Sequence, residues 1–226
     1  MMNALTDLRP GDIMLGPIGG LVGLGVGLGQ LVLGEAFRSG ALSVRHAGIV
    51  VRGAEWSGGI LVVPPLLAQA MPSGAEIVEM NEGHWTERHA YVRLLEDYAG
   101  QALDAAGMAA AMVREGVAYS WASYLFLAAW KLTGQSWLAR WIDRRRPPRQ
   151  LPLSPSGREY SVRLPREAIC SVFAEQSWTL VGKCVVRGTR PQAVTPGMLA
   201  DTLAQYEGAT WCRPRPGRGS ARVWTI

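Results

Sequence analysis

His46-Ala47-Gly48-Ile49-Val50-Val51 is the clearest strand signal in the chain. A short run rich in β-branched residues is typical of a β-strand. Four further β signals follow it, separated by Gly, Pro, Ser and Asn residues, over residues 59–63, 66–70, 76–80 and 90–94. This spacing predicts an antiparallel sheet or barrel in the first half of the chain.

The residues before this strand hold a turn, a short strand and a glycine-rich apolar run. Turn-forming residues over 8–12 lead into a predicted strand over residues 13–15. The apolar run over residues 13–34 is long enough for a membrane span, but it contains eight glycines and Pro17. We therefore predict a buried, helix-like segment over residues 19–38 in place of a membrane helix.

The start of the chain does not have the charge pattern of a secretory signal, because it contains Asp7, Arg9 and Asp12. We therefore expect no signal peptide and synthesis in the cytoplasm. Action outside the cell of origin would then require delivery by a virion or a non-classical export route.

The second half of the chain changes to helical spacing. Apolar residues recur at helical intervals over residues 97–115, and a helical stretch rich in Trp and Leu follows over residues 121–142. Residues 143–163 contain four prolines and six arginines and are predicted to form a long loop. The remaining predicted elements are a helix over 166–180, a short strand over 181–186, a helix capped by Thr195, and an irregular tail from residue 211.

Strands therefore come first and helices after, an order that fits the α+β class. With 226 residues, of which 48% are hydrophobic, the chain is large enough for one core and too small for two. We predict one domain over residues 1–210, followed by a basic C-terminal tail over residues 211–226.

Charge and cysteine content bear on two questions of function: whether the protein binds an anionic polymer, and whether it holds a metal or disulfides. The net charge of +5 comes almost entirely from arginine, which is concentrated in residues 140–149 and 213–222. Such clusters can bind nucleic acid or an anionic cell-wall polymer, but a solvated loop and tail account for them, and we predict no specific nucleic-acid partner. The three cysteines form no CxxC pair, so neither a zinc site nor a disulfide framework is indicated, and no cofactor is expected.

Three residues have the chemistry of a thiol hydrolase, which needs a thiolate, a base beside it, a group that orients the base, and donors for the oxyanion. Cys170 lies early in a predicted helix, where the helix dipole stabilises a thiolate and the backbone N–H can donate to an oxyanion. His46 begins its strand, where its ring can point over the sheet edge. Gln69 is a lone polar residue in an apolar strand, and its side-chain oxygen can fix the imidazole tautomer.

Each of these residues also has a purely structural interpretation. A small cysteine in a helix is more often part of the core than a nucleophile. A histidine at a strand start is commonly a surface or capping residue, and Gln69 can face solvent. His84 and His89 are rival bases, but both lie in a polar turn, whereas Cys184 lies among apolar residues.

Five pieces of the sequence, taken together and in order, resemble one protein family. They cover residues 8–15, 46–50, 67–80, 170–173 and 191–199. In this order they resemble the circularly permuted NlpC-type cysteine peptidases of the papain-like superfamily, over residues 8–205.

The resemblance implies a papain-like α+β fold, with an antiparallel sheet first and the nucleophile helix late in the chain. It implies a catalytic set of Cys170, His46 and Gln69. It also places Tyr119 and Ser171 at positions that contact the substrate.

The sequence departs from the family pattern at several matched positions. Gln69 stands where the family has Glu, which keeps an orienting group but removes a negative charge. Ser120 replaces the Asp of a Tyr-Asp pair, and Arg45 replaces a common Ser. Ile169 precedes the nucleophile position where the unpermuted peptidases have Asp, so the resemblance does not carry their peptide specificity over.

The function implied by the resemblance is a cysteine endopeptidase or amidase that cuts peptidoglycan, delivered by a phage tail or another assembly. Two alternatives use the same residues differently. A lipid acyltransferase, a phospholipase or a deconjugase of ubiquitin-like proteins would use the same thiol, and in a lipid enzyme the apolar residues 19–34 would contact membrane or acyl chain. A structural module of an assembly would carry the site without activity.

Overall fold

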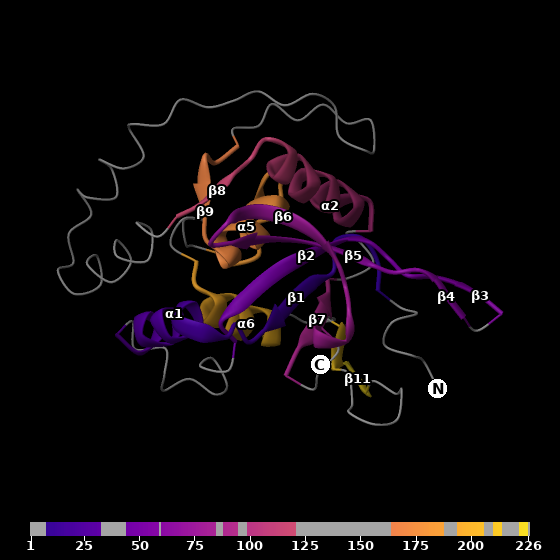
Figure 1. Cartoon of the computed structure of the whole chain (residues 1–226), viewed down its shortest axis with the longest axis horizontal. Coiled ribbons are helices and arrows are strands. Elements are labelled where there is room, and N and C mark those ends of the chain that lie inside the picture. Colours follow the sequence, from indigo (N-terminus) through magenta and orange to yellow (C-terminus); the bar gives the residue numbers. More distant parts are fainter. Residues whose placement is uncertain are drawn as a thin grey trace.

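The protein is built around a seven-stranded sheet in which every neighbouring pair of strands is antiparallel (Figure 1). The structure is a computed structural model that describes residues 8–32, 44–58, 60–84, 88–94, 99–120, 164–187, 194–205, 210–213 and 222–225. The order of strands across the sheet is β11-β10-β7-β1-β2-β5-β6. Their bounds are β1 (Ile13–Gly16), β2 (His46–Arg52), β5 (Leu66–Met71), β6 (Gly74–Glu79), β7 (Ala90–Arg93), β10 (Thr210–Arg213) and β11 (Arg222–Thr225).

Two small sheets and a set of helices complete the described part of the chain. β3 (Glu55–Ser57) and β4 (Ile60–Val63) form a hairpin that extends away from the central sheet (Figure 1). β8 (Ala118–Tyr119) and β9 (Glu167–Ala168) form a short parallel pair. The described helices are α1 (Gly20–Val32), α2 (Ala99–Arg114), α5 (Cys170–Thr179) and α6 (Pro196–Ala204), with a 3₁₀ turn at Glu82–His84.

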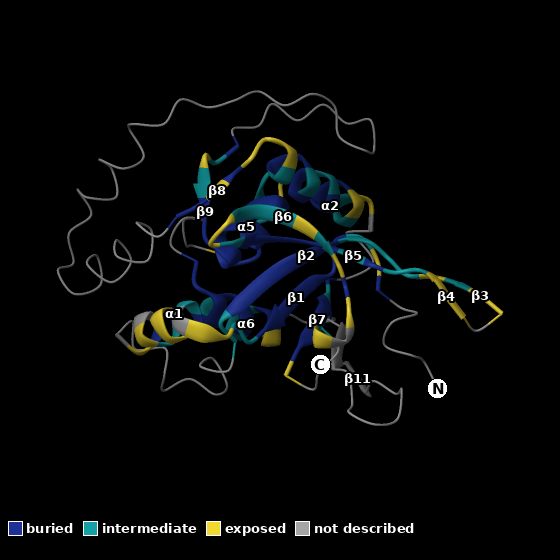
Figure 2. Cartoon of the chain, in the orientation of Figure 1, coloured by how far each residue is buried: buried dark blue, intermediate teal, exposed yellow. Residues whose placement is uncertain are grey.

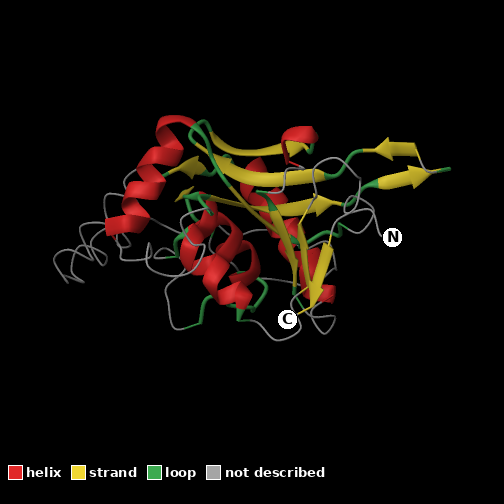
Figure 3. Ribbon diagram, turned by 90° about the horizontal axis from the view of Figure 1, so that it is seen from below, coloured by secondary structure: helices red, strands yellow, loops and turns green. Residues whose placement is uncertain are grey.

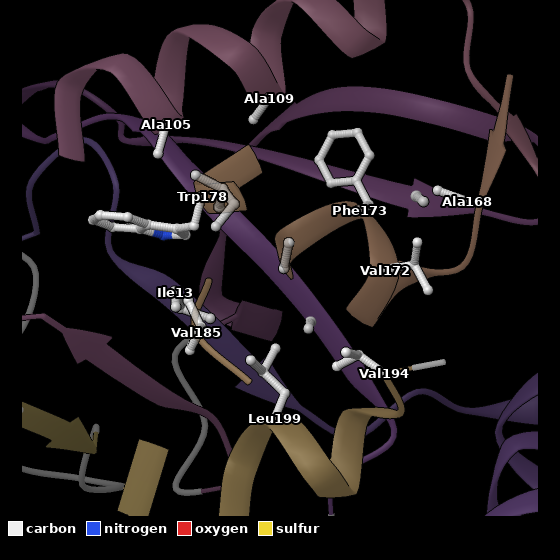
Figure 4. Close-up of a cluster of buried hydrophobic side chains, with 14 of the residues drawn as sticks. Ile13, Ala105, Ala109, Ala168, Val172, Phe173, Trp178, Val185, Val194 and Leu199 are labelled. Carbon is white, nitrogen blue, oxygen red and sulfur yellow. The ribbon is translucent and has the colours of Figure 1, made fainter. Parts of the chain in front are cut away.

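The main core lies between one face of the sheet and helices α2, α5 and α6 (Figure 4). Because successive side chains of a strand point to opposite faces, Ile13 and Leu15 of β1 enter this core while Met14 enters a smaller cluster. α5 contributes Phe173 and Trp178, both essentially inaccessible to solvent. Burial is accordingly heaviest in β1, β2 and α5 (Figure 2), and the view from below shows helices packed beside the strands (Figure 3).

The architecture combines an antiparallel sheet with helices and is compatible with the α+β class expected from the sequence. The predicted strands at residues 13–15, 46–51 and 66–70 lie within one residue of the observed bounds at each end. The predicted cap of the last helix is also present, since the Thr195 hydroxyl accepts a hydrogen bond of 3.1 Å from the Met198 N–H. The predicted helix at 121–142 and the predicted loop at 143–163 lie outside the described residues.

The helix predicted over 166–180 begins later than expected, at Cys170. Residues 167–168 form β9 instead, pairing with β8, and Ile169 has an extended backbone (φ −85°, ψ 165°). The residues that helical propensity assigns to the first turn of this helix therefore pair as a strand instead. As a consequence, Cys170 is the first residue of its helix.

The strand predicted over residues 181–186 is absent, and a carboxylate takes the place of a strand partner. The side chain of Glu175 is buried in α5 and accepts hydrogen bonds from the N–H groups of Val185 (2.9 Å) and Val186 (3.2 Å). The Cys184 thiol donates to the same oxygen at 3.4 Å. The turn after α5 is thus held by one buried side chain rather than by a sheet.

The tail expected to be irregular contains two strands, β10 and β11, which extend the central sheet beyond β7. β7 would otherwise present a row of unpaired backbone groups at a sheet edge, and pairing with β10 satisfies them. The arginine, proline and glycine content of residues 213–222 obscured this strand signal in the sequence.

α1 covers only part of the apolar run that raised the question of a membrane span. It has 13 residues. Among the residues that the structure describes, no helix combines the length and apolar character needed to cross a bilayer. The Gln30 side chain of α1 donates to the Val44 carbonyl oxygen at 2.9 Å, which ties the helix to the segment that enters β2.

We predict that Glu175→Ala lowers the free energy of unfolding by about 2–4 kcal/mol, because it leaves buried N–H groups without an acceptor. Glu175→Gln retains one acceptor oxygen and is expected to lose less. Urea unfolding followed by circular dichroism measures both. Glu79→Ala is the control, because Glu79 is an exposed residue of β6; equal unfolding midpoints for Glu175→Ala and Glu79→Ala would contradict this role for Glu175.

Candidate active site

Cys170 combines a helix terminus with a buried thiol. It is the first residue of α5, and its neighbour Ile169 offers no side-chain cap, so the positive end of the helix dipole acts on the cysteine. The residue is 1% exposed. Its thiol lies 3.8 Å from the backbone carbonyl oxygen of Arg45, the residue that immediately precedes His46. α5 therefore places the sulfur against the start of β2, although 125 residues of chain separate Cys170 from Arg45.

His46 is held by a side chain of the neighbouring strand. Its ring Nε2 lies 2.8 Å from Oε1 of Gln69, and both residues are buried. The register of β2 and β5 explains the contact, since Gln69 lies opposite Gly48 and His46 is two residues from Gly48 on the same face. The contact between Gln69 and His46 that the sequence predicts is thus present in the structure.

The hydrogen bond that His46 Nε2 donates to Gln69 leaves the other ring nitrogen, Nδ1, for the sulfur. An amide oxygen only accepts, so Nε2 carries the proton in this contact. Nδ1 is buried, and no nitrogen or oxygen of the described residues bonds to it.

The electrostatic surroundings of His46 favour its imidazolium form. Burial lowers the pKa of His46, but the bond to Cys170 and its negative charge, the bond to Gln69 and the charge of Glu76 together outweigh burial and raise the pKa. The thiolate of Cys170 is the largest of the favourable influences. An imidazolium beside a thiolate is the charge state that activates a cysteine nucleophile.

The pKa values of the alternative residues, His84, His89 and Cys184, are shifted in directions that disfavour an imidazolium–thiolate pair. Burial, together with the positive charges of His84 and His46, lowers the pKa of His89 to about 4, and burial also lowers the pKa of His84. Both are therefore poor partners for a thiolate at neutral pH. Burial and the charge of Glu175 raise the pKa of the Cys184 thiol, which disfavours its thiolate.

His89 nevertheless lies close to the site, which the sequence did not indicate. Gly16 pairs with His46 across β1 and β2, and a Cβ added to Gly16 would collide with Cδ2 of the His89 ring. The ring can occupy that place only because Gly16 has no side chain.

The two residues assigned to substrate contact are buried. Ser171 is inaccessible to solvent, and its hydroxyl donates to the Val194 carbonyl oxygen at 2.7 Å, which ties α5 to the segment before α6. Tyr119 lies in β8 and packs into the main core. Substrate contact by either side chain stays a prediction.

Glu76 is the residue of this site that sequence reasoning missed. Its Oε1 accepts a hydrogen bond of 3.0 Å from Nε2 of Gln69. The signal was present in the hairpin, because two residues separate β5 from β6 and this sets Gln69 directly opposite Glu76. Within the described residues, no group of three or more His, Cys, Asp and Glu side chains is arranged to hold a metal ion.

Comparison with known proteins does not place the chain in a family: no protein-family model matches it, and no curated protein matches it. The resemblance to permuted NlpC-type peptidases therefore stays a prediction, as do the catalytic roles of the three residues.

We predict that iodoacetamide modifies Cys170 at least about tenfold faster than Cys184 near pH 6, because a helix terminus and an imidazolium favour the Cys170 thiolate. Mass spectrometry of tryptic peptides after timed exposure measures both rates. His46→Ala is expected to slow modification of Cys170 and leave that of Cys184 unchanged. Faster labelling of Cys184 would contradict the assignment of the nucleophile.

Proposed function

We propose that this protein is a thiol hydrolase in which Cys170 is the nucleophile, His46 the acid and base, and Gln69 the group that orients the imidazole. The observation that carries the proposal is the hydrogen bond between His46 and Gln69, together with the Cys170 thiol 3.8 Å from the carbonyl oxygen of Arg45, the residue before His46. Three distant segments of the chain meet there, at the first residue of a helix and at adjacent strands of a sheet.

In the proposed reaction, the Cys170 sulfur attacks the carbonyl carbon of an amide and forms a tetrahedral intermediate. The backbone N–H of Cys170 donates to the oxyanion. Collapse of the intermediate breaks the C–N bond while the His46 imidazolium gives its proton to the leaving amine. Neutral His46 then accepts a proton from water, whose oxygen attacks the thioester, and the acid is released with the thiol regenerated.

The order of elements supports a permuted papain-like arrangement for this chemistry. The sheet that carries His46 and Gln69 precedes the helix that carries Cys170. In the proposed family this is the order that distinguishes permuted members from unpermuted ones.

For the substrate we propose a peptide or amide bond of peptidoglycan, on the strength of the family resemblance. The arginine-rich residues 140–149 offer charge complementary to an anionic cell-wall polymer. A phage tail or another assembly is the proposed route to such a substrate.

A second candidate substrate is a lipid ester or amide, and one observation favours it. α1 exposes Leu24, Leu28 and Leu31, at 58%, 56% and 54% of their surface, and their spacing along the chain puts them on one face of the helix. α1 also lies next to the residues that lead into His46, since Gly27 is close to the Arg45 guanidinium. An acyl chain lying on this face would reach the neighbourhood of the thiol.

We predict that the purified protein releases soluble muropeptides from cell-wall sacculi and that Cys170→Ser abolishes the release, because serine is far less nucleophilic beside the same imidazole. Chromatography and mass spectrometry of the released fragments identify the bond that is cut. Cys184→Ser is the matched control and is expected to retain the activity.

Phosphatidylcholine and phosphatidylglycerol vesicles provide the parallel test of the lipid candidate. Release of fatty acid that depends on Cys170 and is lost in Leu24→Ser/Leu28→Ser would favour lipid over peptidoglycan. An absence of Cys170-dependent turnover on both substrates would overturn the choice of substrate class, while the alkylation profile of Cys170 would still report on the site.

A further inference from the structure

Glu76 adds one more hydrogen bond to the contacts at the site. It lies on β6, the strand at one end of the seven-stranded sheet. Gln69 uses both ends of its side-chain amide, with the oxygen 2.8 Å from His46 Nε2 and the nitrogen 3.0 Å from Glu76 Oε1. Glu76 is partly exposed, whereas Gln69 and His46 are 6% and 5% exposed. The carboxylate therefore stays in contact with solvent while it acts on buried groups.

The hydrogen-bonding capacities of these groups fix the direction of the whole series. An ionised carboxylate only accepts, so the side of Gln69 that faces Glu76 has to be the NH₂ group. The oxygen of Gln69 then faces His46 and can only accept, which requires a proton on Nε2 of the imidazole. In neutral His46 this leaves the lone pair on Nδ1, the nitrogen that is available to the Cys170 thiol.

Glu76 also supplies the negative charge that Gln69 lacks. The charge acts on His46 in the direction that favours the imidazolium. His84 and His89 act electrostatically on His46 as well, and their positive forms oppose its protonation. Burial keeps His89 neutral above about pH 4, and the two negative charges that favour the imidazolium of His46 are the Cys170 thiolate and, as a smaller influence, Glu76.

We propose that Glu76 is a positioning residue of the thiol site, which orients the Gln69 amide and supplies, through Gln69, the negative charge that a carboxylate would otherwise supply directly to His46. The proposal rests on the thiol-hydrolase function proposed above. Glu76 does not touch the reacting atoms.

Glu76→Gln is the sharpest variant, because it keeps the shape and an acceptor oxygen but removes the charge and the obligatory direction of the bond. We expect kcat/KM to fall by about 3-fold to 30-fold, less than for loss of a group that transfers the proton itself. The alkaline limb of the pH profile is expected to move down by about 0.4 to 1 pH unit, because loss of a negative charge makes the imidazolium easier to deprotonate. Glu79→Gln is the matched control: the residue is exposed on the same strand, and its profile should superimpose on that of the parent.

Exchanging the two side chains tests the charge separately from the contact. Gln69→Glu alone sets two carboxylates against each other, one at each end of the present 3.0 Å contact, and repulsion should impair the site. The double variant Gln69→Glu/Glu76→Gln restores a single charge, now directly beside His46. We expect it to recover activity over Gln69→Glu and to place the alkaline limb at or above the position of the parent.

The rate of Cys170 alkylation against pH gives the same readout without a substrate, and so separates this proposal from the function it rests on. A profile that moves in Glu76→Gln and is restored in the double variant supports the role of Glu76, whatever substrate is cut. Superimposable profiles for the parent, Glu76→Gln and Glu79→Gln would overturn it, even if Cys170→Ser abolishes hydrolysis. A profile in the parent that shows an ordinary thiol, independent of His46, would instead overturn the thiol-hydrolase function itself.

Discussion

The packing of α5 against β2 is the contact on which the rest of the site depends. Phe173 and Trp178 anchor the helix in the main core, and the buried Glu175 closes the turn that follows it. Because the helix is fixed along its length, its first residue cannot drift from the start of β2. Hydrophobic burial has no directional preference of its own. The close packing of the whole helix nevertheless fixes the position of the Cys170 sulfur.

The polar side chains of the candidate site form a connected set of hydrogen bonds. His46 and Gln69 are both buried, and burial of unpaired polar groups is costly. The register of three neighbouring strands solves the problem, because it aligns His46, Gln69 and Glu76 so that each one satisfies the next. The last member of the series is partly exposed, so the charge that stabilises the buried imidazolium does not itself bear the full cost of desolvation.

Amide and carboxylate therefore have separate tasks in this arrangement. Gln69 determines the geometry of the imidazole, and Glu76 adds the electrostatic bias from one strand further away. A carboxylate at position 69 would combine both tasks, at the cost of burying its charge. Because the carboxylate is on Glu76 and not on residue 69, water can still solvate its charge.

The sequence alone determined the local features of this protein. Short apolar and β-branched runs bounded by turn residues placed the strands at residues 13–15, 46–51 and 66–70, the helical spacing located α2, and Thr195 marked the start of α6. The same patterns singled out Cys170, His46 and Gln69, since a polar or reactive residue in an apolar setting is visible without any knowledge of the fold. All of these features depend on neighbours within a few positions along the chain.

Only the tertiary structure decided the features that depend on distant partners. The start of α5 at Cys170 follows from the pairing of β9 with β8, and the turn at 185–186 follows from the buried carboxylate of Glu175. The place of the Cys170 sulfur beside the start of β2 depends on the packing of α5 against the sheet, across 125 residues of chain. Such contacts join residues whose separation along the chain bears no relation to their separation in space, so helical and strand periodicity carries no record of them.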